Sequence, residues 1–333
     1  MEKLTYPIID TGMTRFYGPR GEIARPGPGE PLYGQDAHYR GIPPAYKDND
    51  DGTVSDLNTG LMWQKTTDAR PVTLECRVTW YEGEEYARRL RLGRYDDWRV
   101  PSIKELISLV DANGEMRKRI PYLDPRYFDL TYGPESIDGY RAIDVQLVTT
   151  TSYISKTVGW SDWWGEFGEK RIGPSRMHLA PSFFGYNFSD GRIKGYPKTE
   201  HPYLGTPTWV IRCVRGPQYG VNNFVDNGDG TVSDLATGLM WQKADDGKCR
   251  DWQEALSYAE NLQLAGYRDW RLPDQKELHS IVDYGFIPAI NPVFHMQDPR
   301  GWFWSSTPFI DFRGQAVYIA FGKGTGKTSA RSE

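Results

Sequence analysis

The stretch YKDNDDGTVSDLNTGLMWQK, residues 46–65, returns as FVDNGDGTVSDLATGLMWQK at residues 224–243, and sixteen of the twenty aligned positions are identical. A second block follows in each copy, because DWRVPSIKEL at 97–106 matches DWRLPDQKEL at 269–278. Self-similarity of this kind indicates a duplicated structural unit. The sequence therefore predicts two homologous domains in tandem, a first repeat at 46–216 and a second at 224–333, with a Pro/Gly-rich leader at 1–45 and a linker at 217–223.

Length, charge and hydropathy narrow the class of protein. A chain of 333 residues fits two domains. Its 40 Lys and Arg against 44 Asp and Glu give a net charge of −4, so no basic field favours nucleic acid as a partner. No apolar run approaches the ~20 residues of a membrane-spanning helix, and residues 1–7 contain no apolar signal-peptide core. We expect a soluble protein that is either cytoplasmic or numbered after removal of an export signal.

Local patterns predict an α+β fold. Asp, Asn and Gly before a Thr-Val pair are typical of a turn between short strands. Apolar residues at helical spacing predict helices from Trp80 to Leu92 and over 252–262, stopped by Gly93 and Gly266. A second helix in each copy begins with a capping box, formed by Ser102 with Glu105 and by Asp274 with Glu277. Each copy ends in alternating strands, and the framework tryptophans are expected in the cores: Trp63, Trp98, Trp241 and Trp270.

These motifs, together with Trp-Ser-Ser-Thr at 304–307 and Arg-Cys-Val-Arg-Gly at 212–216, resemble a bacterial family. It is the domain of unknown function 1566, also called the C-terminal domain of the Legionella collagen-like adhesin. The resemblance implies tandem C-type-lectin-like domains, each with two helices and short antiparallel sheets. It also implies a secreted or surface protein that binds polysaccharides or other proteins, with no defining catalytic activity.

Two departures from the family pattern bear on function. The second repeat reaches Glu333 without an Arg-Cys-Val-Arg-Gly strand, so we expect it to be truncated or completed from elsewhere. The first repeat has Val148-Thr149-Thr150-Thr151 where the second has Trp-Ser-Ser-Thr. The first repeat is therefore interpreted as a structural platform.

The positions of the three cysteines agree with the repeat pattern. Cys76 precedes the first helix and Cys213 lies in the closing strand of the same copy, so a Cys76–Cys213 disulfide is the hypothesis, with Cys249 left without its counterpart. Such a bridge implies an oxidising compartment. The alternative is three buried free thiols in a cytosolic protein.

The sequence indicates no cofactor, and calcium is a possible ion. The candidate ligands are four turn carboxylates: Asp48, Asp51, Asp226 and Asp229. An EF-hand loop needs Gly at its sixth position, whereas Gly52 and Gly230 occupy the fifth. Turn formation is therefore the favoured interpretation of these residues.

Candidate binding residues lie in two irregular aromatic segments. The first segment contributes Trp160, Asp162, Trp163, Trp164 and Glu166, and the second contributes Arg300, Trp302 and Trp304. Aromatic faces stack on sugars and also dominate protein–protein hot spots. The alternative is that these tryptophans are core residues.

The sequence favours a non-enzymatic, exported bacterial binding protein at the cell surface, outside the cell or in the periplasm. Its ligand would be a glycan or a macromolecular surface, and the alternative is a structural or assembly subunit of a larger complex. An enzyme of the formylglycine-generating type is a minor alternative, because that chemistry needs an active thiol pair and the three cysteines are far apart in sequence.

Overall fold

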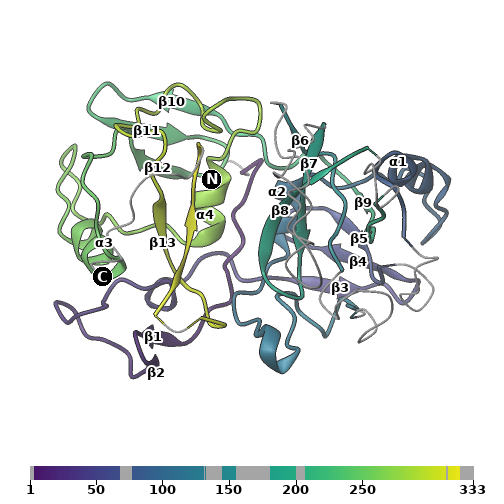
Figure 1. Cartoon of the computed structure of the whole chain (residues 1–333), viewed down its shortest axis with the longest axis horizontal. Helices are drawn as coiled ribbons and strands as arrows, with labels where there is room; N and C mark the ends of the chain where they lie inside the picture. The colour runs from purple at the N-terminus through teal and green to yellow at the C-terminus, as the bar shows by residue number, and fades with distance from the viewer. Residues whose placement is uncertain are drawn as a thin grey trace, which may run out of the picture. The chain divides into compact units, whose positions relative to one another are not determined.

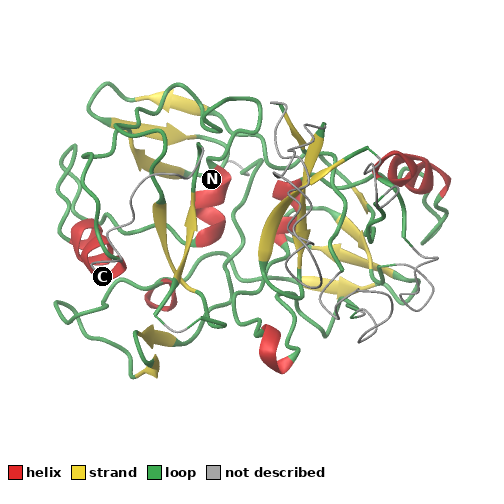
Figure 2. Ribbon diagram, viewed as in Figure 1, coloured by secondary structure: helices red, strands yellow, loops and turns green. Residues whose placement is uncertain are grey.

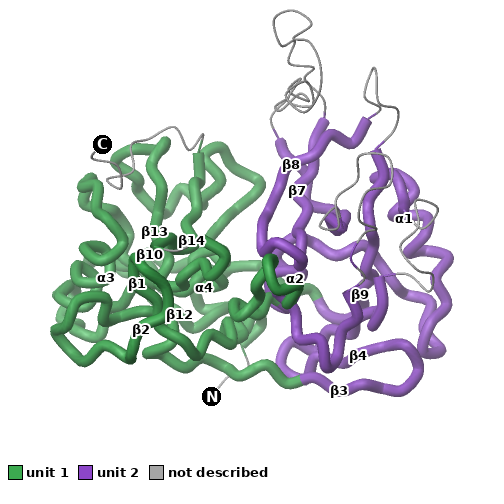
Figure 3. Tube along the Cα trace, turned by 60° about the horizontal axis from the view of Figure 1, so that its bottom comes forward, with its two compact units in different colours: residues 1–45, 110–120, 218–333 green, residues 46–109, 121–217 purple. Residues whose placement is uncertain are grey.

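The computed structural model describes residues 4–67, 77–130, 132, 145–154, 181–199, 207–312 and 314–322. The chain forms two compact units (Figure 3). We call residues 46–109 with 121–217 the first-repeat unit, and residues 1–45, 110–120 and 218–333 the second-repeat unit. Few helices and several small antiparallel sheets make the fold α+β, as the sequence predicts (Figure 2).

The first-repeat unit contains two antiparallel sheets (Figure 1). One has the order β3-β4-β5-β9, and the other has the order β6-β7-β8. Its helices are α1 (Trp80–Arg89) and α2 (Ile103–Ser108). The strands are β3 (Tyr46–Asp48), β4 (Thr53–Asp56), β5 (Met62–Gln64), β6 (Ser152–Tyr153), β7 (Ser182–Asn187), β8 (Arg192–Pro197) and β9 (Val214–Arg215).

The second-repeat unit contains counterparts of several of these elements, together with the leader. Its three-stranded sheet has the order β10-β11-β12, and two further hairpins are β13-β14 and β1-β2. The helices are α3 (Trp252–Glu260) and α4 (Gln275–Ser280), with short 3-10 turns η1 (Asp36–His38) and η3 (Met116–Lys118). The strands are β1 (Phe16–Gly18), β2 (Gly21–Ile23), β10 (Phe224–Asp226), β11 (Thr231–Asp234), β12 (Leu239–Gln242), β13 (Phe303–Pro308) and β14 (Ala316–Ile319).

Capping boxes begin each of the four α-helices found among the described residues. The predicted boxes at Ser102/Glu105 and Asp274/Glu277 are confirmed. Thr79 with Glu82 and Asp251 with Glu254 form two more, at the start of α1 and α3. In each box two otherwise unsatisfied backbone N–H groups find acceptors, which defines where the helix begins.

The predicted helix ends are wrong. α1 ends at Arg89 and α3 at Glu260, before Gly93 and Gly266. Both glycines have positive φ, 58° and 82°, and each lies in a tight turn closed by a single antiparallel bridge. Their role is to allow this turn, because a left-handed backbone favours glycine.

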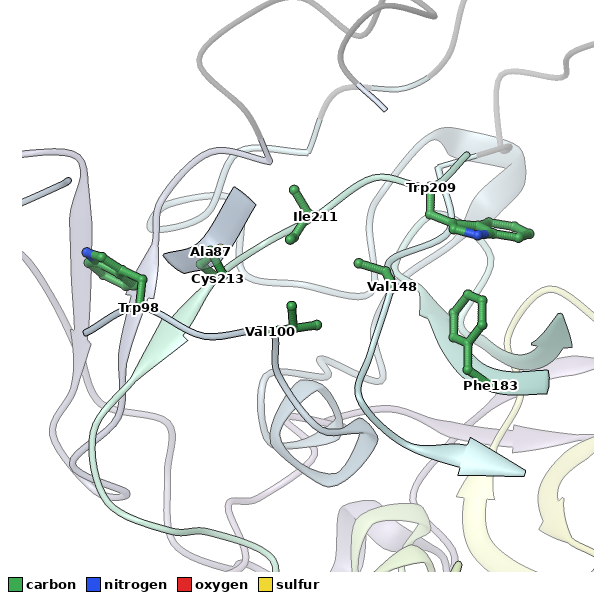
Figure 4. Packing of buried hydrophobic residues seen from close by; sticks show 8 residues of the cluster. All are labelled: Ala87, Trp98, Val100, Val148, Phe183, Trp209, Ile211 and Cys213. Carbon is green, nitrogen blue, oxygen red and sulfur yellow. The ribbon is translucent and has the colours of Figure 1, made fainter. Parts of the chain in front are cut away.

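Each unit has its own hydrophobic core. The first-repeat core contains Ala87, Trp98, Val100, Val148, Phe183, Trp209, Ile211 and Cys213 (Figure 4). The second-repeat core contains Val232, Leu278, Ile281, Val282, Ile290, Phe294 and Phe321. Trp63 and Trp98 are buried as predicted, with 0% and 4% exposed, whereas Trp241 and Trp270 are only half-buried.

The leader packs within the second-repeat unit through buried polar contacts. Asp36, from η1, accepts hydrogen bonds from the Thr11 hydroxyl at 2.9 and 2.8 Å and from the Thr307 hydroxyl at 2.6 Å. The Lys276 ammonium donates to the carbonyl oxygen of Asp10 at 3.1 Å. Burial raises the pKa of Asp36 to about 6, although the two threonine hydrogen bonds oppose this shift.

The raised pKa of Asp36 predicts a pH-dependent stability. A carboxyl group titrates near 3.9 in an unfolded chain, so between about pH 4 and 6 the folded state binds more protons than the unfolded state. The contribution of Asp36 to the free energy of unfolding is therefore greatest below pH 4. It falls by on the order of 2 kcal/mol as the pH rises to 6.

Urea unfolding of the wild type and of Asp36→Asn between pH 4 and 7 measures this effect. The Asn variant lacks the titrating group, so its free energy of unfolding should fall less over this range. Parallel pH profiles for the two proteins would contradict the assignment.

Candidate functional site

The second-repeat unit contains a groove with a volume of about 590 Å³. β12 and α3 line it, together with residues 269–273 and 301–304. Apolar and aromatic side chains predominate, with a few charged groups among them, as in many ligand-binding sites.

Two of the predicted binding residues, Trp302 and Trp304, lie in this groove and are half-buried. The Trp302 ring lies 4.3 Å from the ring of Tyr318, which is 44% exposed, and the Trp304 ring meets Tyr318 edge-on at 5.9 Å. The Trp304 indole N–H donates to the carbonyl oxygen of Arg250 at 3.0 Å. The Trp302 indole N–H is shielded from solvent and has no hydrogen-bond acceptor among the described residues.

Charged residues are placed along the same groove. The Arg250 guanidinium lies 4.0 Å from the centre of the Tyr258 ring and pairs with Asp246 at 2.5 Å. The hydrogen bond from Arg250 lowers the pKa of Asp246 to about 2, so this carboxyl is ionised throughout the neutral range. Asp269 is exposed, and it forms no ion pair within the described part of the chain.

Of the other predicted binding residues, only Arg300 lies among the described residues. Arg300 is exposed, pairs with Asp298 at 3.0 Å and does not line the groove. Five residues lie outside the described residues: Trp160, Asp162, Trp163, Trp164 and Glu166. The structure also assigns to the groove residues that the sequence did not single out, among them Arg250, Tyr258, Tyr267 and Asp269. The repeat alignment is the signal that could have found Tyr267 and Asp269, because their counterparts Tyr95 and Asp97 contact Arg215 in the first repeat.

The four candidate calcium ligands are engaged in turns. The carboxylate of Asp48 accepts from the Asp50 backbone N–H at 3.0 Å and pairs with Lys65 at 2.5 Å. Asp51 accepts from the backbone N–H and the hydroxyl of Thr53. The turn at Asp226 and Asp229 repeats each of these contacts, with Lys243 and Thr231 as partners.

No group of three or more His, Cys, Asp or Glu side chains suited to a metal ion occurs among the described residues. The turn contacts account for all four carboxylates without an ion. Calcium binding stays a prediction of the sequence alone.

Only one of the two cysteines in the predicted disulfide lies among the described residues. Cys213 is buried in the first-repeat core, and Cys76 lies outside the described residues. No disulfide occurs in the part of the chain that is described. The Cys76–Cys213 bridge therefore stays a prediction. Cys249 is exposed and lines the groove.

Comparison with known families agrees with the repeat pattern. The model of the Lcl C-terminal domain family matches residues 52–215 and 230–333, which is well over half of the chain. The chain belongs to the Lcl C-terminal domain family. Membership suggests an adhesin-like surface protein. Neither the curated proteins nor the solved structures contain a match to this Lcl-family chain.

Among the described residues, no helix has the length and apolar character needed to cross a membrane.

Proposed function

We propose that this Lcl-family protein is an exported, adhesin-like binding protein without enzymatic activity, and that it recognises a glycan or a macromolecular surface. The recognition surface is the groove of the second-repeat unit, with Trp302 and Trp304 as its aromatic contacts. The observation that carries this proposal is the combination of half-buried indoles, ionised carboxylates and an arginine in one groove. Stacking on an indole together with hydrogen bonds to carboxylates is an arrangement suited to a sugar ring or to a polar protein surface.

The second candidate function is that of a structural or assembly subunit. It is favoured by the same groove, because a largely apolar surface that also carries polar residues is typical of protein interfaces as well. The two candidates differ in the partner: a glycan or cell-surface ligand in the first, and a stoichiometric protein partner in the second.

A glycan array probed with the full chain tests the first candidate. We expect Trp302→Ala to weaken a specific glycan signal by about tenfold or more, since loss of one aromatic contact costs on the order of 1–2 kcal/mol. Tyr81→Ala is the matched control, because Tyr81 is an aromatic residue of α1 that is 58% exposed and belongs to the other unit. A Trp163→Ala/Trp164→Ala variant tests the other aromatic segment.

Two results would redirect the proposal. Loss of signal only in the Trp163/Trp164 variant would move the recognition surface to the first repeat. Silence on the array, together with a stable stoichiometric protein partner in pull-downs, would replace the first candidate with the assembly subunit.

A further inference from the structure

One segment of the first repeat, Thr208–Gly216, closes the core of its unit, and it has no counterpart among the described residues of the second repeat. Its last residues form β9, which pairs antiparallel with β5 so that Val214 faces Trp63. The segment also exchanges backbone hydrogen bonds with Arg99, at 2.9 and 3.0 Å, and Val210 donates to Gln146 at 3.0 Å. Three of its side chains join the hydrophobic core, as Figure 4 shows: Trp209, Ile211 and Cys213.

In the second repeat, the residues that would contact such a segment line the groove. β12 is the counterpart of β5, and in the described sheet it is an edge strand with only β11 beside it. Trp241 and Trp270 correspond to the buried Trp63 and Trp98, and both are half-buried, with no described strand beside β12 on the side where β9 pairs with β5. The counterparts of Gln64, Arg99 and Gln146 also line the groove: Gln242, Arg271 and Trp302.

The side chains that contact Arg215 of the closing segment in the first repeat have counterparts in the second repeat. Arg215 pairs there with Asp97 at 2.6 Å and lies 3.7 Å from the centre of the Tyr95 ring. The corresponding residues are Asp269 and Tyr267, which both line the groove, and Tyr267 is 47% exposed. The groove is thus lined by both a carboxylate and an aromatic ring, and no described cation pairs with that carboxylate.

Acceptors for a second arginine are also present. Arg212 is fully buried and donates to the carbonyl oxygens of Gln64, Lys65 and Asp129, at 2.7, 2.6 and 2.6 Å. The counterparts of these three residues in the groove are Gln242, Lys243 and His295. His295 corresponds to Asp129 because the two residues make equivalent hydrogen bonds. The backbone N–H of Asp129 donates to the carbonyl oxygen of Lys65, and the backbone N–H of His295 donates to the carbonyl oxygen of Lys243.

We propose that the groove binds an extended strand from another polypeptide chain, paired antiparallel with β12. The strand has apolar side chains at alternate positions and two arginines three residues apart, as in Thr208–Gly216. Main-chain hydrogen bonds to the edge strand would provide affinity, and the two arginine sites and the apolar groove would provide sequence specificity. This inference rests on the proposed function because it takes the same groove as the binding surface. It adds the class of partner, which is an extended polypeptide strand.

The probe is a synthetic peptide with the sequence of residues 208–216 carrying Cys213→Ser, which prevents oxidation to a mixed disulfide with the exposed Cys249. Calorimetric titration into the full chain should show one site per molecule, with a dissociation constant on the order of micromolar. A peptide of the same composition in scrambled order should not bind. A peptide with Arg215→Gln in addition should bind about tenfold more weakly, since it loses the charge that pairs with Asp269.

Two protein variants distinguish the groove from the rest of the chain. Asp269→Asn should weaken peptide binding about tenfold at low salt, because it removes the carboxylate that the arginine would meet. Asp97→Asn is the matched control, since its carboxylate already pairs with Arg215 of its own repeat, and binding should be unchanged. Absence of peptide binding, equal binding of the scrambled peptide, or equal effects of the two variants would overturn the proposal.

The outcomes separate this inference from the proposed function. A glycan signal that depends on Trp302, together with no peptide binding, would overturn the strand proposal and leave the adhesin proposal intact. Peptide binding with a silent glycan array would support the strand proposal and remove the glycan as the ligand of the groove.

Discussion

Replacing Arg212 with alanine is expected to lower the free energy of unfolding of the first-repeat unit by about 4 kcal/mol. The side chain is fully buried, and its three hydrogen bonds satisfy the carbonyl oxygens of Gln64, Lys65 and Asp129. A hydrogen bond to a charged group contributes about 1.5–3 kcal/mol, and a carbonyl left buried without a donor costs about 1–3 kcal/mol. Burial lowers the pKa of Arg212 to about 10, so the guanidinium is still protonated at neutral pH.

Arg215→Ala is the matched control, because it removes an arginine three residues along the same segment. Its ion pair with Asp97 is partly exposed, with side-chain exposures of 21% and 57%. Pairs of this kind contribute at most about 1 kcal/mol. Urea unfolding followed by circular dichroism measures both variants. Equal losses would show that the buried carbonyl contacts of Arg212 stabilise the unit no more than the exposed ion pair of Arg215 does.

The second large effect is expected from a pair of equivalent tryptophans. Trp63→Ala should destabilise the first-repeat unit by about 3–5 kcal/mol, the range for a large aromatic removed from a packed core. Trp63 is 0% exposed and lies in β5, which pairs with β9, whereas Trp241 is half-buried at the groove. Trp241→Ala should therefore cost its own unit less than half as much.

Scanning calorimetry of the full chain measures both variants, since each substitution should shift the unfolding transition of its own unit. The two sites have nearly the same local sequence, so the difference isolates the effect of the closing segment. Equal shifts would mean that the second-repeat core is as well covered as the first. In the presence of the 208–216 peptide, the cost of Trp241→Ala should rise, because the bound strand would bury this ring.

Local sequence was sufficient to predict the elements that are stabilised by contacts between residues close together in the chain. The capping boxes at Ser102 and Asp274 were predicted because the side chain and the backbone groups that it satisfies lie within three residues of each other. The turns at Asp48 and Asp226 were predicted for the same reason. The helix ends were not, because Gly93 and Gly266 serve turns that follow the helices.

The candidate site was only partly accessible to sequence analysis. Trp302 and Trp304 were singled out as irregularly placed aromatics, and both line the groove. Asp269 and Tyr267 were not, because nothing in their local sequence distinguishes them from Asp97 and Tyr95, which are engaged with Arg215. Their difference arises from a segment more than a hundred residues away in the chain.

The sequence by itself determined the duplication, the α+β class and the start of each predicted helix, because repeats and caps are properties of neighbouring residues. Only the tertiary structure decided which face of a repeat is covered. Trp63 and Trp241 have the same neighbours in sequence, yet one lies in a strand paired with β9 and the other lines a groove. The physical reason is that burial depends on non-local strand pairing, and the second-repeat unit, as described, leaves the edge of β12 without a neighbouring strand.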